Sequence, residues 1–504
     1  MNRMDLQAIL TCAALGFVAC LTLIPSIRRH HATREGQNIR SFHHTHGKSV
    51  TRFGGVGLAG AFALVAILAA VFYSERLRFS TDVVCVVGAM AMFGLGFWDD
   101  CRPLGAKLKF TGQIVIAAGV YMAGVGIELI KNPFTGETVV LGAWGLAASI
   151  IWLVAFTNLI NLVDGIDGLA GGISLMLMCL LVCVGFGSHS YSTLLAAGTA
   201  GALLAFLYFN FPPAKIYMGD GGAYFLGFLI GALTITSSHK GTVAAALLAP
   251  LFAMALPILD VTLAIVRRGL KGLPIFRPDR QHIHHRLVGI GFSRRRTLLT
   301  LYALSLACLA MALAAFWSQG RLVPILFGVM FLTILFSARC FGFLQDWLAV
   351  RKAVGTSLQL RKESRYALAM MTWLEMEAER CDNLQELWTS YLFVTRKLGF
   401  AQVRLVLERD TDFVWKSQTS SGTELLRRRH ELRLANITAI EYCAEPSAMP
   451  ATVFEHLTEL AAETWMKVVQ RWQKANGQPI RFEPAVMNIV PLVEPGRVLV
   501  ANAA

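Results

Sequence analysis

The amino-acid sequence predicts a polytopic α-helical membrane protein with a small α+β domain at its C-terminal end. Hydrophobic residues make up 55% of the 504 residues and charged residues only 15%, whereas a soluble domain is about 25% charged. Apolar runs long enough to cross a bilayer recur before residue 345. Lys and Arg gather in alternate loops between these runs, which is typical of a chain that crosses the membrane many times.

About eleven apolar runs are predicted to be transmembrane helices. Several are rich in glycine and alanine, which lets helices pack closely in lipid. In chain order, the predicted spans are 6–27, 53–73, 82–98, 110–127, 143–163, 169–187, 193–211, 221–238, 243–266, 299–317 and 322–341.

The basic loops predict the orientation of the chain. The richest are residues 28–52, 102–109 and 267–296, while the loops on the opposite side are short and carry few cations. The positive-inside rule places the basic loops in the cytoplasm, the N-terminus outside and the C-terminal region inside. A net charge of +14 follows from this topology and from contact with anionic lipid, so no nucleic-acid partner is expected.

Composition changes after about residue 343. We therefore expect a transmembrane domain at 1–343, a charged linker helix at 344–380 and an accessory domain at 381–504. In the last region, helical spacing at Leu384–Leu392 is followed by the alternating stretch "AQVRLVLE", by "RHELRLANITAIEYCAE" and by an amphipathic helix. This order predicts a small α+β cytoplasmic domain.

Four polar clusters fall at the cytoplasmic ends of the predicted spans. "NLINLVDGIDGLAGG" places Asn158, Asn161, Asp164 and Asp167 at a steady spacing of three. Polar groups at membrane depth are costly and usually functional. The other clusters are "GFWDDCRPLGAKLK", "NFPPAKIYMGDGG" and the His/Arg-rich loop "RPDRQHIHHRL". Each has an ordinary explanation as a span end, a helix cap or a topogenic charge run.

The joint position of these clusters predicts their chemistry. Carboxylates suit Mg²⁺, and a dense His/Arg loop suits a polyphosphate. At a membrane surface they would bind a metal and a soluble diphosphate next to a lipid acceptor, which is the arrangement that phosphoryl transfer requires.

With these four motifs in this order, residues 1–340 resemble the polyprenyl-phosphate N-acetylhexosamine-1-phosphate transferase superfamily. The histidine loop is most similar to the bacterial undecaprenyl-phosphate N-acetylglucosamine-1-phosphate transferases. The resemblance implies transfer of GlcNAc-1-phosphate from a UDP-sugar to undecaprenyl phosphate at the cytoplasmic face of the bacterial inner membrane, with release of UMP. It implies a first step of a lipid-linked glycan such as lipopolysaccharide or a cell-wall polymer. A homodimer is compatible with it.

The resemblance also implies roles for individual residues. Asp220 matches a metal-ligating aspartate, with Mg²⁺ as the expected cofactor and Mn²⁺ as an alternative. The expected catalytic residues are Asp99, Asp100, Lys107 and His282. The expected substrate-binding residues are Asn158, Asn161, Asp164, Asp167, Asn210, Arg268, His284 and His285. The loop before the second predicted span lacks the prolines that the family often has there, and in it only His46, Arg52, Gly54 and Gly55 match the family.

Three other functions stay open at this stage. A phospho-N-acetylmuramoyl-pentapeptide transferase would belong to the same superfamily. A transporter would need its polar site near mid-membrane, whereas here nearly all the polar groups lie at cytoplasmic span ends, with Asp260, after Pro257, as the exception. A membrane-bound sensor would work through the C-terminal domain, in which we find no catalytic or ligand-binding motif.

Overall fold

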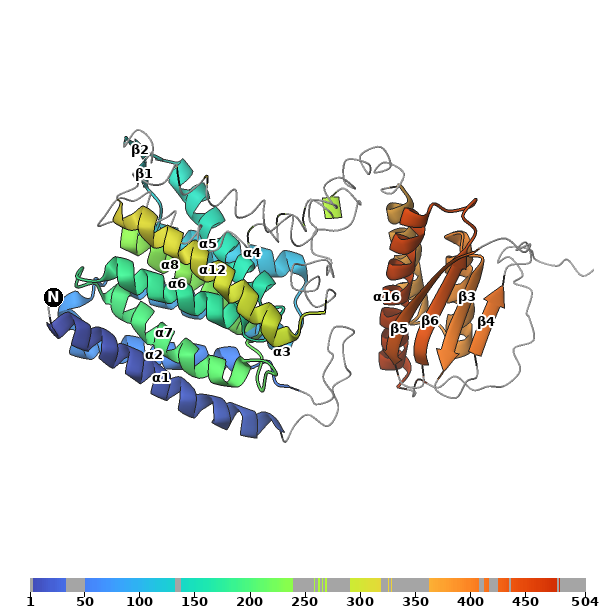
Figure 1. Cartoon of the computed structure of the whole chain (residues 1–504), viewed down its shortest axis with the longest axis horizontal. Helices are drawn as coiled ribbons and strands as arrows, with labels where there is room; N and C mark the ends of the chain where they lie inside the picture. The colour runs from blue at the N-terminus through green and yellow to red at the C-terminus, as the bar shows by residue number, and fades with distance from the viewer. Residues whose placement is uncertain are drawn as a thin grey trace, which may run out of the picture. The chain divides into compact units, whose positions relative to one another are not determined.

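The computed structural model of the chain describes residues 3–32, 50–131, 137–238, 291–318, 362–407, 412–416, 425–434, 437–477 and 480, with isolated positions between 258 and 328. The chain divides into two compact units, the second consisting mainly of residues 349–504. Figure 1 shows the helices of the first unit and the sheet of the second.

The first unit is a bundle of helices. Its helices are α1 (Arg3–Ala32), α2 (Gly54–Phe72), α3 (Asp82–Cys101), α4 (Ala106–Met122), α5 (Trp144–Val163), α6 (Leu169–Gly185), α7 (Tyr191–Asn210), α8 (Gly219–Ser238) and α12 (Arg294–Trp317), with the 3-10 turn η1 (Ser74–Arg76). A hairpin of β1 (Leu129–Lys131) and β2 (Thr138–Val140) joins α4 to α5.

Among the described helices, α1, α2, α3, α5 and α7 are long and apolar enough to cross a membrane. The prediction of a polytopic helical membrane protein is therefore confirmed. Each of the first eight predicted spans overlaps one helix, and the tenth overlaps α12. The spans predicted at 243–266 and 322–341 lie almost entirely outside the described residues, so the count of eleven stays a prediction.

Small residues bring the helices of the bundle close together. A Cβ atom added to Gly16 of α1 would lie 1.9 Å from the carbonyl oxygen of Gly198 in α7. One added to Gly201 of α7 would lie 1.9 Å from the carbonyl oxygen of Ala13. The two backbones are thus in direct contact, which is the packing expected where lipid provides no hydrophobic drive between helices.

The second unit is built around a four-stranded antiparallel sheet. Its strand order is β4–β3–β6–β5, with β3 (Gln402–Leu407), β4 (Asp412–Lys416), β5 (Leu426–Leu434) and β6 (Ile437–Ala444). The stretch "RHELRLANITAIEYCAE", whose pattern predicts one strand, contributes to the two paired strands β5 and β6. Val403, Leu405 and Leu407 alternate into the core as predicted.

Helices complete the core of the second unit. They are α15 (Leu384–Lys397), α16 (Ala451–Asn476) and the helix of residues 362–377. The rings of Trp388, Tyr391 and Trp465 pack together, with Trp388 and Trp465 centroids 5.0 Å apart. Met371 and Leu374 are buried in the same core. The described part of the expected linker helix therefore packs as a core element of this unit. The placement of the second unit in the cytoplasm stays a prediction.

Candidate active site at the ends of α3 and α8

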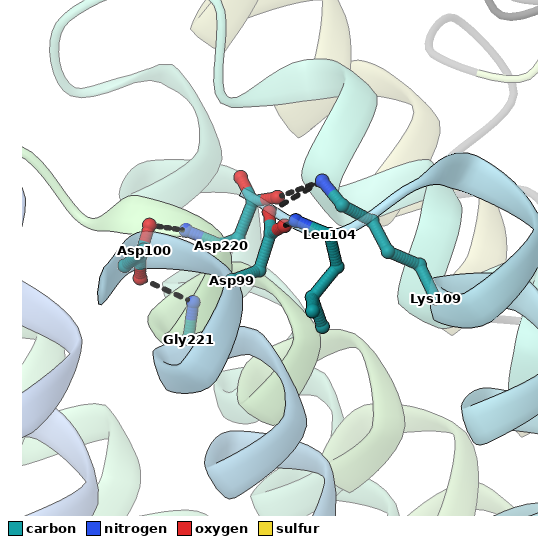
Figure 2. A network of polar contacts seen from close by, with 6 residues as sticks. All are labelled: Asp99, Asp100, Leu104, Lys109, Asp220 and Gly221. Carbon is teal, nitrogen blue, oxygen red and sulfur yellow. Dashed lines mark hydrogen bonds and ion pairs between the residues drawn. The ribbon is translucent and has the colours of Figure 1, made fainter. Parts of the chain in front are cut away.

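Asp100 holds the beginning of α8 against the end of α3. Its Oδ1 accepts a hydrogen bond from the N–H of Asp220 at 2.9 Å, and its Oδ2 accepts one from the N–H of Gly221 at 2.8 Å (Figure 2). The first N–H groups of a helix have no partner within the helix. A carboxylate at this position satisfies them and interacts favourably with the helix dipole. Both oxygens of Asp100 are thus used to position the neighbouring helix.

Asp99 and Asp220 share one cation. The ammonium of Lys109 forms an ion pair with Asp99 and a second with Asp220, whose Oδ2 lies 3.1 Å from Nζ (Figure 2). Asp99 also accepts a hydrogen bond from the N–H of Leu104 at 2.6 Å. Three elements, α3, α4 and α8, therefore bring two carboxylates and an ammonium together.

Lys109 was not among the predicted catalytic residues, whereas Lys107 was. Both lie in the first turn of α4, which begins at Ala106. Successive helical residues are about 100° apart, so residues two apart point in nearly opposite directions. Lys107 is exposed and Lys109 is half-buried. The structure brings Lys109 to the carboxylates, and a role for Lys107 stays a prediction.

Glycines allow the motif at the start of α8 to fit between its neighbours. Gly219 has a φ of +75°, and a Cβ there would lie 2.2 Å from the carbonyl oxygen of Arg52. At the start of α2, the N–H of Gly55 donates to the carbonyl oxygen of Met218 at 2.8 Å. A Cβ on Gly55 would meet the backbone of Gly222 at 2.4 Å. The Gly54–Gly55 and Gly221–Gly222 pairs are therefore contact points between α2 and α8.

The "DGIDG" loop is tied to the loop that follows α7. Asn210, which is 2% exposed, accepts a hydrogen bond from the N–H of Gly168 at 2.9 Å and donates to the carbonyl oxygen of Ile216 at 2.8 Å. Asp167 accepts one from the N–H of Ala214 at 3.0 Å. The side-chain oxygen and nitrogen of Asn210 are both engaged by the backbone. The structure thus supports a positioning role for Asn210, where the sequence predicts substrate binding.

Asn158 also binds a neighbouring element. Its Nδ2 donates to Oε1 of Gln113 in α4 at 2.7 Å and to the carbonyl oxygen of Val154 at 2.8 Å. Asn161 lies about one turn further along α5 and is half-buried. A substrate acceptor that used this amide nitrogen would have to displace one of these two bonds.

Asp164 follows the last residue of α5 and faces the other carboxylates. Burial, together with the carboxylates of Asp220 and Asp100, raises the pKa of Asp164 well above its usual value, while Arg52 acts in the opposite direction. The site therefore holds an excess of negative charge. A bound cation would relieve this repulsion.

The last four predicted residues belong to the basic loop at 267–296. His282, His284 and His285 lie outside the described residues. Arg268 is buried, and its role at the site stays a prediction.

The carboxylates fit an open magnesium site better than a closed one. Within the described part of the chain, no group of three or more His, Cys, Asp or Glu side chains is arranged to hold a metal. Mg²⁺ usually takes one or two carboxylates and completes its shell with water and substrate phosphates. Asp99 and Asp220 already share one cation, the ammonium of Lys109, and their oxygens have the chemistry that Mg²⁺ prefers.

Comparison with known proteins identifies similar sequences. The profile of glycosyl transferase family 4 matches residues 82–238, which include α3, α8 and the loops between them. The chain is 35% identical over 296 residues to a probable undecaprenyl-phosphate N-acetylglucosaminyl 1-phosphate transferase of Bacillus subtilis, covering 58% of this chain and 80% of that protein.

Two further relatives show the breadth of the likeness. A decaprenyl-phosphate N-acetylglucosaminephosphotransferase of Mycobacterium tuberculosis is 35% identical over 277 residues, covering 50% of this chain and 68% of that protein. A phospho-N-acetylmuramoyl-pentapeptide-transferase of Lactiplantibacillus plantarum is 31% identical over 247 residues, covering 45% of this chain and 74% of that protein.

Proposed function

The chain belongs to glycosyl transferase family 4, and we propose that it transfers N-acetylglucosamine 1-phosphate from UDP-N-acetylglucosamine to undecaprenyl phosphate. In this reaction a phosphate oxygen of the lipid attacks the sugar-bearing phosphorus of the donor. The bond from that phosphorus to the bridging oxygen breaks, and UMP leaves with this oxygen. The relatives named as N-acetylglucosamine 1-phosphate transferases support this donor over the muramoyl-pentapeptide one.

The observation that carries the proposal is the pairing of Asp99 and Asp220 through Lys109. Three phosphate groups must meet in this reaction, and all are anionic. Lys109 supplies a positive charge at the carboxylates, where it can pair with a phosphate oxygen. Mg²⁺ held by Asp220 and Asp99 would neutralise the diphosphate and the leaving UMP.

The contacts of the paired aspartates favour binding roles over proton transfer. Asp99 is ion-paired with Lys109 and accepts a backbone N–H, and both interactions stabilise its anionic form. A carboxylate stabilised in this way is a weak base. Asp100 is occupied at both oxygens by the start of α8. We assign Asp99 to binding the metal and Lys109, and Asp100 to positioning Asp220.

We also propose where the reaction takes place. The active site lies on the cytoplasmic side of a bacterial inner membrane, because the basic loops lie at the same span ends as the carboxylates. UDP-sugars come from the cytosol and the lipid phosphate lies at the bilayer surface. The product would begin a lipid-linked glycan of the cell envelope.

A direct assay tests the donor. The purified protein is given undecaprenyl phosphate and Mg²⁺ with one of three donors: UDP-N-acetylglucosamine, UDP-N-acetylgalactosamine or UDP-N-acetylmuramoyl-pentapeptide. Release of UMP and formation of lipid-linked sugar are measured together. We expect both products with UDP-N-acetylglucosamine. Turnover only with the pentapeptide donor would show that the chain works as a muramoyl transferase, and no turnover with any donor would contradict the proposal.

A further inference from the structure

The helix of residues 362–377 has an apolar stripe on the side opposite the core. Its inner side is buried in the second unit, at Ala367, Met371 and Leu374. Its outer side carries Tyr366, Trp373 and Met376, with exposed fractions of 42%, 36% and 56%. Residues separated by three, four or seven positions share one side of a helix. The three side chains therefore form one continuous exposed stripe.

The stripe continues onto α15. The ring of Trp373 contacts Phe393 edge to face, with centroids 5.9 Å apart. The ammonium of Lys397 lies over the Phe393 ring, 5.6 Å from its centroid. Aromatic rings from two helices thus form one surface, with a cation at its edge.

The charges beside the stripe are mainly positive. Lys362 and Arg365 are exposed on the same outer side of the helix. Two acidic residues of this segment turn toward α16 instead, where Arg471 contacts Glu375 at 3.8 Å and Glu379 at 2.7 Å. Glu363 and Glu377 are half-buried at the flanks. Exposed cations therefore border exposed aromatic rings.

We propose that this surface docks on the anionic surface of the membrane that holds the first unit. We call it the aromatic-basic face, and it consists of Lys362, Arg365, Tyr366, Trp373, Met376, Phe393 and Lys397. Trp and Tyr favour the interface between lipid and water, and Lys and Arg beside an apolar stripe are attracted to anionic lipids. A soluble protein partner of matching shape would need acidic groups, but a membrane supplies both the anionic headgroups and the apolar layer.

The position of this face in the chain supports the membrane as its partner. The helix of residues 362–377 begins about 45 residues after Trp317, the end of α12. Among the described helices of the second unit it comes first along the chain, so in sequence it directly follows the membrane-spanning part. Docking would hold the second unit at the bilayer surface without involving any residue of the candidate active site.

The test uses the full chain in lipid nanodiscs that hold one copy each. A fluorescent amino acid with polarity-sensitive emission replaces Met376, and in a matched protein it replaces Glu459, an exposed residue of α16. Discs contain phosphatidylcholine alone or with phosphatidylglycerol. We expect a blue shift at position 376 only when phosphatidylglycerol is present, its loss at high salt, and no shift at position 459.

Two pairs of substitutions make the test specific. Lys362→Gln with Arg365→Gln should lower the ratio of docked to free probe about 25-fold, since each basic residue near an anionic surface contributes roughly fivefold. Arg427→Gln with Arg429→Gln removes the same charge from one face of β5 and should leave the ratio unchanged. Circular dichroism and transfer activity show that both variants fold.

Three results would overturn the proposal. One is the absence of a blue shift at position 376 in either kind of disc. The second is an equal blue shift in both kinds of disc, which would mean that protein, from this chain or a second copy, covers the face. The third is an equal effect of the two pairs of substitutions, which would mean that only net charge is sensed.

Discussion

Replacing Lys109 by Met tests whether its ammonium is the cation of the candidate site. The side chain of Asp99 is 8% exposed and that of Asp220 is 31% exposed. A hydrogen bond to a charged group contributes about 1.5–3 kcal/mol, and we take the upper end for the enclosed Asp99 contact. The Asp220 contact is more solvated, so we discount it to about 1 kcal/mol. The sum is about 3–4 kcal/mol, or roughly 10²–10³-fold in kcat/KM if the transition state uses both contacts.

The assay measures UMP release for Lys109→Met and Lys107→Met, together with the melting temperature of each protein. Lys107 is exposed two residues away, so its loss removes the same charge from α4 but leaves the cluster intact. We expect the large loss of kcat/KM only in Lys109→Met. Equal losses in the two variants, or near-normal turnover in Lys109→Met, would refute the reasoning.

A second measurement on the same variants separates the ammonium from the metal. Lys109 contacts the carboxylates proposed to hold Mg²⁺, so the two cations compete for the same oxygens. Lys109→Met should therefore need less Mg²⁺ for half-maximal activity, even though its maximal rate is low. A higher Mg²⁺ requirement would mean that Lys109 helps to bind the metal indirectly.

Three further predictions follow from the structure. Asp220→Asn, or chelation of Mg²⁺, should abolish UMP release while the melting temperature stays close to that of the unchanged protein; near-normal turnover would remove Asp220 from the metal site. Asn210→Ala should lower the melting temperature by breaking the bonds to Gly168 and Ile216, which contribute about 1–3 kcal/mol; an unchanged melting temperature with a raised KM would instead support substrate binding. Asp164→Asn should raise the melting temperature at neutral pH and lower the transfer rate. The folded state raises the pKa of Asp164, so the stability linked to this group is fully present below its unfolded pKa and is lost as pH rises toward the folded pKa. The difference in melting temperature between the variant and the unchanged protein should therefore increase from acidic to neutral pH. A difference that stays constant or decreases would contradict this reasoning.

The sequence was sufficient to predict the described membrane-spanning helices, because apolar length determines spans, and to predict that the "GFWDD" and "MGDGG" motifs meet. The position of the histidine loop and the sides of the membrane stay predictions. It could not choose between Lys107 and Lys109. That choice depends on where α4 begins, and the predicted span began at residue 110, four residues after the helix does. The cap that Asp100 forms on α8 was equally inaccessible, since it requires knowing that the end of α3 meets the start of a helix 120 positions away. The core position of residues 362–377 was missed because that segment is highly charged on its flanks.

The polar residues at a spacing of three around "DGIDG" do not all lie on one helix. α5 ends at Val163, so the series does not follow one helical side. Asn158 binds Gln113 and Asp167 binds the backbone of Ala214, which leaves Asp164 beside the carboxylates of α3 and α8. Polar groups at this end of the bundle thus divide into those that hold loops, such as Asn158 and Asp167, and Asp164, which lies in the negative potential of the neighbouring carboxylates. Near Asp164, a cationic metal and an anionic donor would restore the charge balance.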